Sequence, residues 1–241
     1  KEISRYPMKS FHSFQNMFAA FRYNLFTFKE LDLFKDLELK KISSCKDELE
    51  KEQINQLIDM IDAFPIYQDW KKKLSWIDYG DMIYNLWKLV NKEASILEKL
   101  QSQYKHIIID EYQDNNYALS MIVEKIAKPE NNIMVVGDDD QCIYGFRQAS
   151  IQNLHWFKNQ YINKDVIPIS LYENYRSSEL IIKLANSIIA KNPNRMIKKE
   201  LKSNKTINIK PILYIGSEKD QMAQLVENIK RLLREGECSS D

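Results

Sequence analysis

The chain has few cysteines and glycines and no long apolar run, and each of these absences excludes a class of protein or site. Its 241 residues include five glycines and three cysteines. Cys45, Cys142 and Cys238 are too few and too scattered to predict a disulfide framework or a zinc site, and they favour a reducing, cytoplasmic setting. No apolar run approaches the ~18 residues that a membrane-spanning helix needs. We therefore expect no membrane partner.

A further absence concerns phosphate binding. None of the five glycines is followed by Lys-Ser or Lys-Thr, so the chain has no GxxxxGK[ST] phosphate loop. The chain also begins at Lys1 rather than at a methionine. Both features lead us to expect an internal portion of a longer protein.

Two uninterrupted apolar runs give the clearest indication of the fold. Residues 107–109 are three isoleucines followed by Asp110 and Glu111, and residues 134–136 are followed by Gly137 and Asp138. Such runs predict strands that are buried on both faces of a parallel sheet. Because open α/β sheets bind ligands at the carboxyl ends of their strands, these acidic residues mark a candidate active site.

The acidic pair after the first run suits phosphoryl transfer. Asp110 and Glu111 are both candidate ligands for Mg²⁺, and Glu111 can also orient or deprotonate an attacking water. The alternative is an ordinary strand end, with Asp114 and Asn115 capping a helix that begins at Tyr117. For an isolated Asp-Glu pair this alternative is the simpler interpretation.

The remaining periodicity predicts a helical region and then alternating strands and helices. Between Phe28 and about Lys105 the apolar residues recur at helical spacing, and Pro65 is expected to end one of the helices. Beyond Asp110 we predict helices near residues 117–127, 151–160, 179–190 and 218–234. Strands are predicted near residues 133–136, 166–171 and 207–215. This alternation is typical of βαβ units.

Charge is unevenly distributed although the formal net charge is only +1. Residues 106–140 contain eight acidic residues and two basic ones, which matches a metal-bearing site. Residues 191–210 contain seven basic residues and one acidic residue. The basic stretch would either meet phosphates or form a solvated loop, and the sequence favours neither interpretation.

Three motifs occur in a fixed order: DEYQD at residues 110–114, GDDDQCIYGFR at 137–147 and NYRSS at 174–178. Together they resemble the UvrD/Rep-type superfamily-one DNA helicases. The resemblance implies an α/β fold, namely a RecA-like P-loop NTPase motor domain with a parallel sheet flanked by helices. Residues 1–27 and 105–165 would form this first domain, and residues 28–104 an α-helical insertion. Residues 166–241 would begin a second, truncated RecA-like domain.

The resemblance also implies roles at a nucleotide site. Asp110 and Glu111 would be catalytic and would bind Mg²⁺, and Gln141 would sense the γ-phosphate of ATP. Tyr175 would stack on the adenine, and Arg176 would reach the γ-phosphate from the second motor domain. Without the resemblance, Gln141 would be an ordinary loop residue, and Tyr175 and Arg176 a hinge tyrosine and a surface salt bridge.

A second set of residues is implicated in DNA binding. In the family, an aromatic pair and an arginine grip single-stranded DNA, which here corresponds to Tyr144, Phe146 and Arg147. Residues 10–14, SFHSF, resemble a T-F-H-S element in which Phe11 and His12 would contact the strand. The alternative for both groups is packing in an aromatic core.

Residues 76–83, WIDYGDMI, resemble the DFDDL element of the family, with Gly80 at a position where the family usually has aspartate. The missing carboxylate puts the role of this element in doubt. The simpler interpretation is a helix N-cap with a hydrophobic anchor.

The sequence therefore predicts part of an ATP-dependent DNA helicase that uses ATP and Mg²⁺. By resemblance it would translocate 3′ to 5′ on single-stranded DNA and unwind duplex DNA in repair or recombination. By itself the chain should not hydrolyse ATP, because it lacks a phosphate loop. The alternatives are a subunit of a helicase–nuclease and a non-catalytic DNA- or protein-binding module. The full reading frame would separate them by showing what precedes Lys1 and follows Asp241.

Overall fold

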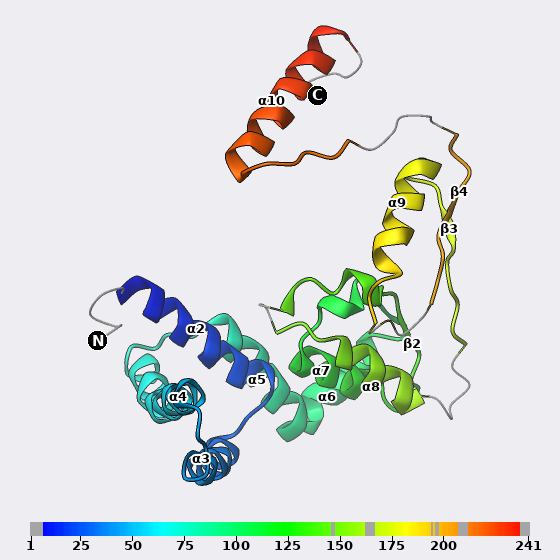
Figure 1. The fold of residues 1–241 in the computed structure, drawn as a ribbon. Coiled ribbons are helices and arrows are strands. Elements are labelled where there is room, and N and C mark those ends of the chain that lie inside the picture. Colours follow the sequence, from blue (N-terminus) through cyan, green and yellow to red (C-terminus); the bar gives the residue numbers. More distant parts are fainter. Residues whose placement is uncertain are drawn as a thin grey trace. The chain divides into compact units, whose positions relative to one another are not determined.

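The computed structural model describes residues 7–145, 148–161, 167–193, 195, 198–206 and 212–236, without the side chains of residues 7–12 and 161 (Figure 1). The chain divides into two compact units, Lys1–Val166 and Ile167–Asp241. Each unit is considered by itself. Among the described residues, none of the helices combines the length and apolar composition that crossing a bilayer requires.

Among the described residues, five helices precede the first strand: α2 (Pro7–Tyr23), α3 (Phe28–Ile42), α4 (Glu48–Lys73), α5 (Tyr79–Lys92) and α6 (Ala94–Gln103). In Figure 1, α2 lies against α5, and α3 lies against α4. A core of aromatic and aliphatic side chains joins α2, α3 and α4: Phe18, Phe21, Leu31, Ile61 and Phe64. The apolar spacing predicted helices only from Phe28 onward, so α2 was not predicted. The shared core fixes the packing of α2 against α3 and α4.

The expectation that Pro65 would end a helix is wrong, because α4 continues through it to Lys73. A proline inside a helix removes one backbone hydrogen bond and crowds the preceding turn. Here the turns on both sides are held by tertiary contacts. Phe64 is fully buried in the aromatic core, and Lys71 is buried in a polar network with α5. These contacts outweigh the local penalty.

A second apolar cluster connects the helical region to the strand region of the first unit. It comprises Leu25, Tyr84 of α5 and Ala118 of α7 (Tyr117–Ala127). The cap of α7 was predicted one to two positions too early. The side chain of Asn116, rather than Asp114 or Asn115, accepts a hydrogen bond from the N–H of Leu119 at 3.0 Å.

Strands β1 (Ile107–Ile109) and β2 (Ile133–Val135) form a two-stranded parallel sheet. Ile107 pairs with Ile133, Ile108 with Met134 and Ile109 with Val135. The expectation that both faces would be buried is wrong, since Ile108 is 67% exposed and Met134, its partner in the register, 51%. These two residues share one face of the sheet, and in this chain only the opposite face is packed.

The first unit also contains the 3₁₀ turns η1 (Tyr112–Asp114) and η2 (Asp139–Gln141) and helix α8 (Ile151–Tyr161). The second unit contains β3 (Glu173–Asn174), α9 (Glu179–Ile189), β4 (Lys202–Ser203) and α10 (Glu218–Arg234), with β3 and β4 parallel. The four helices predicted after Asp110 are confirmed to within one residue at each end.

Two longer strands predicted in the second unit are not found in its described residues. Residues 167–171 and 212–215 have no strand pairing, while residues 166 and 207–211 lie outside the described part. The apolar side chains of these segments, such as Ile169 and Leu213, are exposed. A strand needs a neighbour to accept its backbone hydrogen bonds, and the part of the chain that the structure describes offers these segments none.

Candidate functional site

The two parallel strands bring their acidic ends to one edge of the sheet. Pairing continues past the strands, since the N–H of Val136 donates to the carbonyl of Ile109 at 2.7 Å. The N–H of Tyr112 then donates to the carbonyl of Val136 at 2.9 Å. Asp110 and Glu111 therefore lie at the same edge as the loop that begins at Gly137 and leads to Gln141. This shared edge confirms the arrangement predicted from the sequence.

The backbone of Glu111 is held in the left-handed region, at φ 50° and ψ 44°. A non-glycine residue in this region costs about 1–3 kcal/mol and persists where neighbouring contacts enforce it. The next residue, Tyr112, supplies such contacts, because its side chain is 1% exposed and packs edge-on against Phe157. The turn leaves the carboxylates of Asp110 and Glu111 exposed, and an Asp110 oxygen (Oδ1) accepts from the Glu111 N–H at 2.9 Å.

Gln113 connects the ends of the two strands, a role that the sequence analysis did not assign. Its Nε2 donates to Glu111 Oε2 at 2.6 Å, and its Oε1 accepts from the N–H of Asp138 at 3.0 Å. The side chain is almost completely buried. The residue is part of the DEYQD motif, so its position was visible in the sequence, but the partner across the sheet was not.

Gly137 leaves the space that Gln113 occupies. A Cβ atom at position 137 would lie 2.8 Å from Gln113 Oε1, closer than real Cβ contacts allow. The residue is therefore glycine because of this contact. The loop after β2 could not approach Gln113 in the same way with any larger residue.

Asp138 organises the next turn. Its Oδ1 accepts from the N–H of Asp140 at 3.0 Å, and its Oδ2 accepts from Gln141 Nε2 at 2.9 Å. Carboxylate oxygens of Asp138, Asp139 and Asp140 lie within 4.8 Å of one another. The edge thus offers carboxylate oxygens, the type of ligand that Mg²⁺ prefers. The exposed carboxylate of Asp110 fits such an ion, although exposed acidic groups alone do not define a metal site.

Most of the predicted DNA-binding side chains lie outside the described part of the structure. Phe146 and Arg147 are not described, and Tyr144, which precedes them, is half-buried. Phe11 and His12 lie in α2, but their side chains are not described. Their roles therefore remain predictions from the sequence.

Tyr175 and Arg176 lie in the second unit, directly after β3, and both side chains are exposed. The Tyr175 hydroxyl donates to Glu173 Oε2 at 3.1 Å, and this hydrogen bond raises the pKa of the tyrosine. Asn174 Oδ1 accepts from the N–H groups of Arg176 at 3.1 Å and Ser177 at 2.7 Å, which fixes the turn. Tyr175 also lines an open hollow of this unit with Tyr172 and Lys202.

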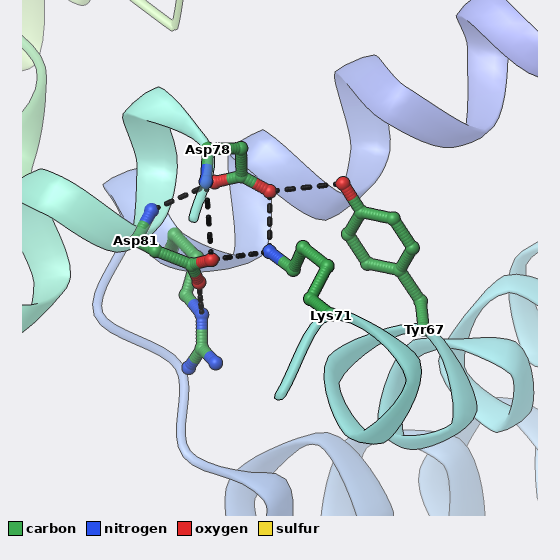
Figure 2. A network of polar contacts seen from close by, with 5 residues as sticks. Tyr67, Lys71, Asp78 and Asp81 are labelled. Carbon is green, nitrogen blue, oxygen red and sulfur yellow. Dashed lines mark hydrogen bonds and ion pairs between the residues drawn. The ribbon is translucent and has the colours of Figure 1, made fainter. Parts of the chain in front are cut away.

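A buried polar network lies in the helical region, centred on Lys71 of α4 (Figure 2). The Lys71 ammonium donates to the carboxylates of Asp78 and Asp81, and the Tyr67 hydroxyl donates to Asp78 at 3.0 Å. Asp81 also pairs with Arg22 of α2. The sequence pattern resembled the DFDDL element, with a helix N-cap and a hydrophobic anchor as the simpler interpretation. The cap is confirmed, since Asp78 and Asp81 form a capping box at the start of α5.

The network lowers the pKa of Asp78 and raises the pKa of Tyr67. Burial acts to raise the pKa of Asp78, but hydrogen bonds from Lys71, the Asp81 N–H and Tyr67 outweigh it and leave that pKa below its ordinary value. Burial, followed by the charge and hydrogen bond of Asp78, raises the pKa of Tyr67 to about 12. The charged form of Asp78 and the neutral form of Tyr67 are therefore both favoured.

Similarity to known proteins extends over most of this unit. A profile of the UvrD/REP helicase N-terminal domain matches residues 8–162, more than half of the chain. The chain is 39% identical to the ATP-dependent DNA helicase PcrA of Bacillus subtilis over 165 residues, which are 65% of this chain and 22% of that protein.

Two further relatives have similar names. The putative ATP-dependent DNA helicase YjcD of Bacillus subtilis is 32% identical over 196 residues, covering 81% of this chain and 25% of that protein. DNA helicase II of Haemophilus influenzae is 34% identical over 138 residues, covering 57% of this chain and 19% of that protein. The chain thus spans about a quarter or less of the length of these three relatives.

Proposed function

The chain belongs to the UvrD/REP helicase N-terminal domain family, and from this membership we propose that it forms part of an ATP-dependent DNA helicase. The whole protein would couple ATP hydrolysis to movement along single-stranded DNA, in the 3′-to-5′ direction, and to duplex unwinding in repair or recombination. The names of its relatives support the helicase activity.

One observation supports this function most directly. Two adjacent parallel strands end side by side, one in Asp110 and Glu111 and the other in the loop that leads to Gln141. Phosphoryl transfer needs carboxylates for a metal ion and for the attacking water, together with a polar group near the transferred phosphate. The edge of the sheet provides these groups within one small region.

We assign a separate task to each residue of this edge. Asp110 would hold Mg²⁺, which neutralises phosphate charge when it is bound, with Glu111 as a further candidate ligand. The main task of Glu111 would be to orient and deprotonate the attacking water, and Gln141 would detect the γ-phosphate. From the second unit, Tyr175 would stack on the adenine and Arg176 would stabilise the transferred charge.

The proposed architecture is a RecA-like motor domain made of residues 1–27 and 105–165. Residues 28–104 would be a helical insertion, and residues 166–241 would begin a second RecA-like domain. The exposed apolar pair Ile108 and Met134 supports a larger assembly, because a motor sheet is covered on both faces. In the whole protein, further elements would cover this pair.

The proposal is tested by DNA-stimulated ATP hydrolysis in the full-length protein that contains this chain. The wild type should hydrolyse ATP faster when single-stranded DNA is added. Glu111→Gln should lower kcat by about 10²–10⁴-fold, the usual contribution of a general base. DNA binding by this variant should stay unchanged, since the substitution removes one charge without altering the size of the side chain.

The isolated chain provides a second comparison. It should show no ATP turnover above background, because it contains no phosphate loop to hold the nucleotide. Turnover by the isolated chain that Glu111→Gln abolishes would contradict this part of the proposal. A full-length protein without any DNA-stimulated hydrolysis would instead favour a non-catalytic binding module.

A further inference from the structure

Gln113 uses both ends of its side-chain amide to join the two halves of the proposed nucleotide site. The Nε2 group bonds Glu111, which follows β1, and Oε1 bonds the N–H of Asp138, which follows β2. The residue is 1% exposed. A side chain this deeply buried has little contact with solvent water, so its polar groups depend on these protein partners.

The connection continues from Asp138 to Gln141. The carboxylate of Asp138 accepts from Gln141 Nε2 at 2.9 Å, and it also accepts from the N–H of Asp140 at 3.0 Å. An unbroken series of hydrogen bonds therefore runs from Glu111 through Gln113 and Asp138 to Gln141. Its two ends are the proposed base and the proposed γ-phosphate sensor.

The two partners require a side chain at position 113 that both donates and accepts, as an amide does. An ionised Glu111 can only accept a hydrogen bond, while the N–H of Asp138 can only donate one. A carboxylate at position 113 would repel Glu111, and an apolar side chain would leave both partners unsatisfied. Gly137 adds an independent constraint, since any Cβ there would collide with Gln113 Oε1.

We propose that Gln113 is a positioning residue that orients Glu111 and links its orientation to the loop that carries Gln141. The inference rests on the proposed function, because it assigns Gln113 to the nucleotide hydrolysis attributed to this site. Glu111 is exposed on a strained backbone, so its carboxylate needs an external tether to keep one orientation. Gln113 supplies that tether from the buried side of the turn.

The test compares Gln113→Met with wild type in the full-length protein. Methionine keeps the length and volume of the side chain but removes both hydrogen bonds. We expect kcat to fall about 10- to 100-fold, the loss that a misplaced catalytic group produces. The KM for ATP and the Kd for single-stranded DNA should change less than about threefold, because Gln113 is buried beneath the turn rather than exposed at its surface. Global destabilisation would instead reduce the active fraction and leave the kcat of the folded molecules unchanged.

Gly137→Ala provides a second route to the same contact if Gln113→Met folds poorly. This substitution keeps the Gln113 amide, but the added Cβ pushes Gln113 Oε1 away from the N–H of Asp138. The kcat should therefore fall again. In the double variant, kcat should fall by less than the product of the two single-variant factors. Both substitutions break the same hydrogen bond between Gln113 and Asp138, so their effects are not independent. Multiplying losses, or wild-type kcat in both single variants, would overturn the inference.

The outcomes also separate this inference from the proposed function. If Glu111→Gln retains full hydrolysis, the proposed function fails, whatever Gln113 does. If Glu111→Gln is inactive while Gln113→Met and Gly137→Ala both match wild type, only the positioning role fails. Loss of hydrolysis in all three variants, with unchanged binding of DNA, supports both.

Discussion

Arg22 Nε lies 3.3 Å from Asp81 Oδ1, and this ion pair joins α2 to the first turn of α5. The guanidinium carbon of Arg22 also lies 4.1 Å from the ring centroid of Tyr84. Both charged side chains are largely buried, at 11% and 8% exposure. Helix α2 contains the predicted DNA-contact element at Phe11 and His12 and is therefore fixed to α5 by a charged contact as well as by apolar packing.

Lys71 should be essential for the stability of the helical region. Its ammonium lies between two carboxylates, so Lys71→Met would leave Asp78 and Asp81 facing each other. Removing one partner of a buried ion pair typically costs about 3–5 kcal/mol, and Arg22 would offset part of this. We therefore expect a loss of about 3 kcal/mol in unfolding free energy, measured by urea denaturation. Lys73→Met is the control, because Lys73 forms an exposed ion pair with Asp69 on the same helix. The urea midpoint of this control variant should barely change.

Stability should fall in alkaline solution as Tyr67 begins to titrate. Its pKa is raised to about 12 in the folded protein, above the ordinary value of 10.0. Between these values the unfolded chain loses the proton while the folded chain keeps it, so the stabilisation is complete below pH 10 and lost toward pH 12. Tyr67→Phe keeps the ring that stacks on Phe18 but cannot ionise. The difference in Tm between wild type and this variant should therefore shrink from pH 9 to pH 11.5; a constant difference would contradict the assignment.

Asp78 should produce the opposite dependence in acid. Because its pKa is lowered in the folded protein, its stabilisation is present above the ordinary value of 3.8 and is lost as the pH falls through the lowered value. Asp78→Asn should be less stable than wild type at pH 7, and the two should converge as the pH falls through the lowered pKa of Asp78. Denaturation curves at a series of pH values would measure this convergence. A constant gap between the two proteins would exclude a role for the charge of Asp78.

Gly80 should be intolerant of a side chain for reasons of space. A Cβ atom there would lie 3.1 Å from Arg22 Cβ and 3.3 Å from Asp78 Oδ1. Since Arg22 is held by Asp81 and Tyr84, it cannot move away easily, and overpacking of this kind costs about 1–3 kcal/mol. We expect Gly80→Ala to lower the unfolding free energy by about 1 kcal/mol, after the helix propensity of alanine offsets part of the cost. Gly145→Ala is the matched control, because a Cβ there meets nothing within 4 Å.

The predicted strand-binding residues can be tested in the full-length protein without reference to their geometry. Phe146→Ala should weaken single-strand binding by ~1–3 kcal/mol with little dependence on base sequence, as expected for a stacking contact. Arg147→Ala should lower the salt dependence of binding by about one phosphate contact. Fluorescence anisotropy with oligonucleotides of different sequence and at several salt concentrations would measure both effects. If Phe146→Ala unfolds the protein and the folded fraction binds normally, Phe146 belongs to the core.

Local sequence patterns were sufficient for the helices after Asp110 and for the parallel sheet edge. The periodicity of residues 117–127 and 218–234 matched the observed bounds of α7 and α10, since a helix forms its hydrogen bonds within one segment. Likewise, two apolar runs ending in acidic residues correctly predicted that Asp110, Glu111 and Gln141 lie at one edge. Each helix depends on residues close together in the chain, and the shared edge follows from the general rule that parallel strands bring their carboxyl ends together.

Only the tertiary structure decided the features that depend on distant partners. Residues 167–171 have no neighbouring strand among the described residues and are not paired there. Pro65 stays helical because Phe64 and Lys71, on the same helix, are anchored by contacts with other helices. Gln113 was visible in its motif, but its partner Asp138 is 25 residues away, and the space for their contact comes from Gly137. The sequence alone determined which residues carry charge and where strands and helices can begin. Packing decided which buried groups face each other, because burial makes their hydrogen bonds depend on one specific partner.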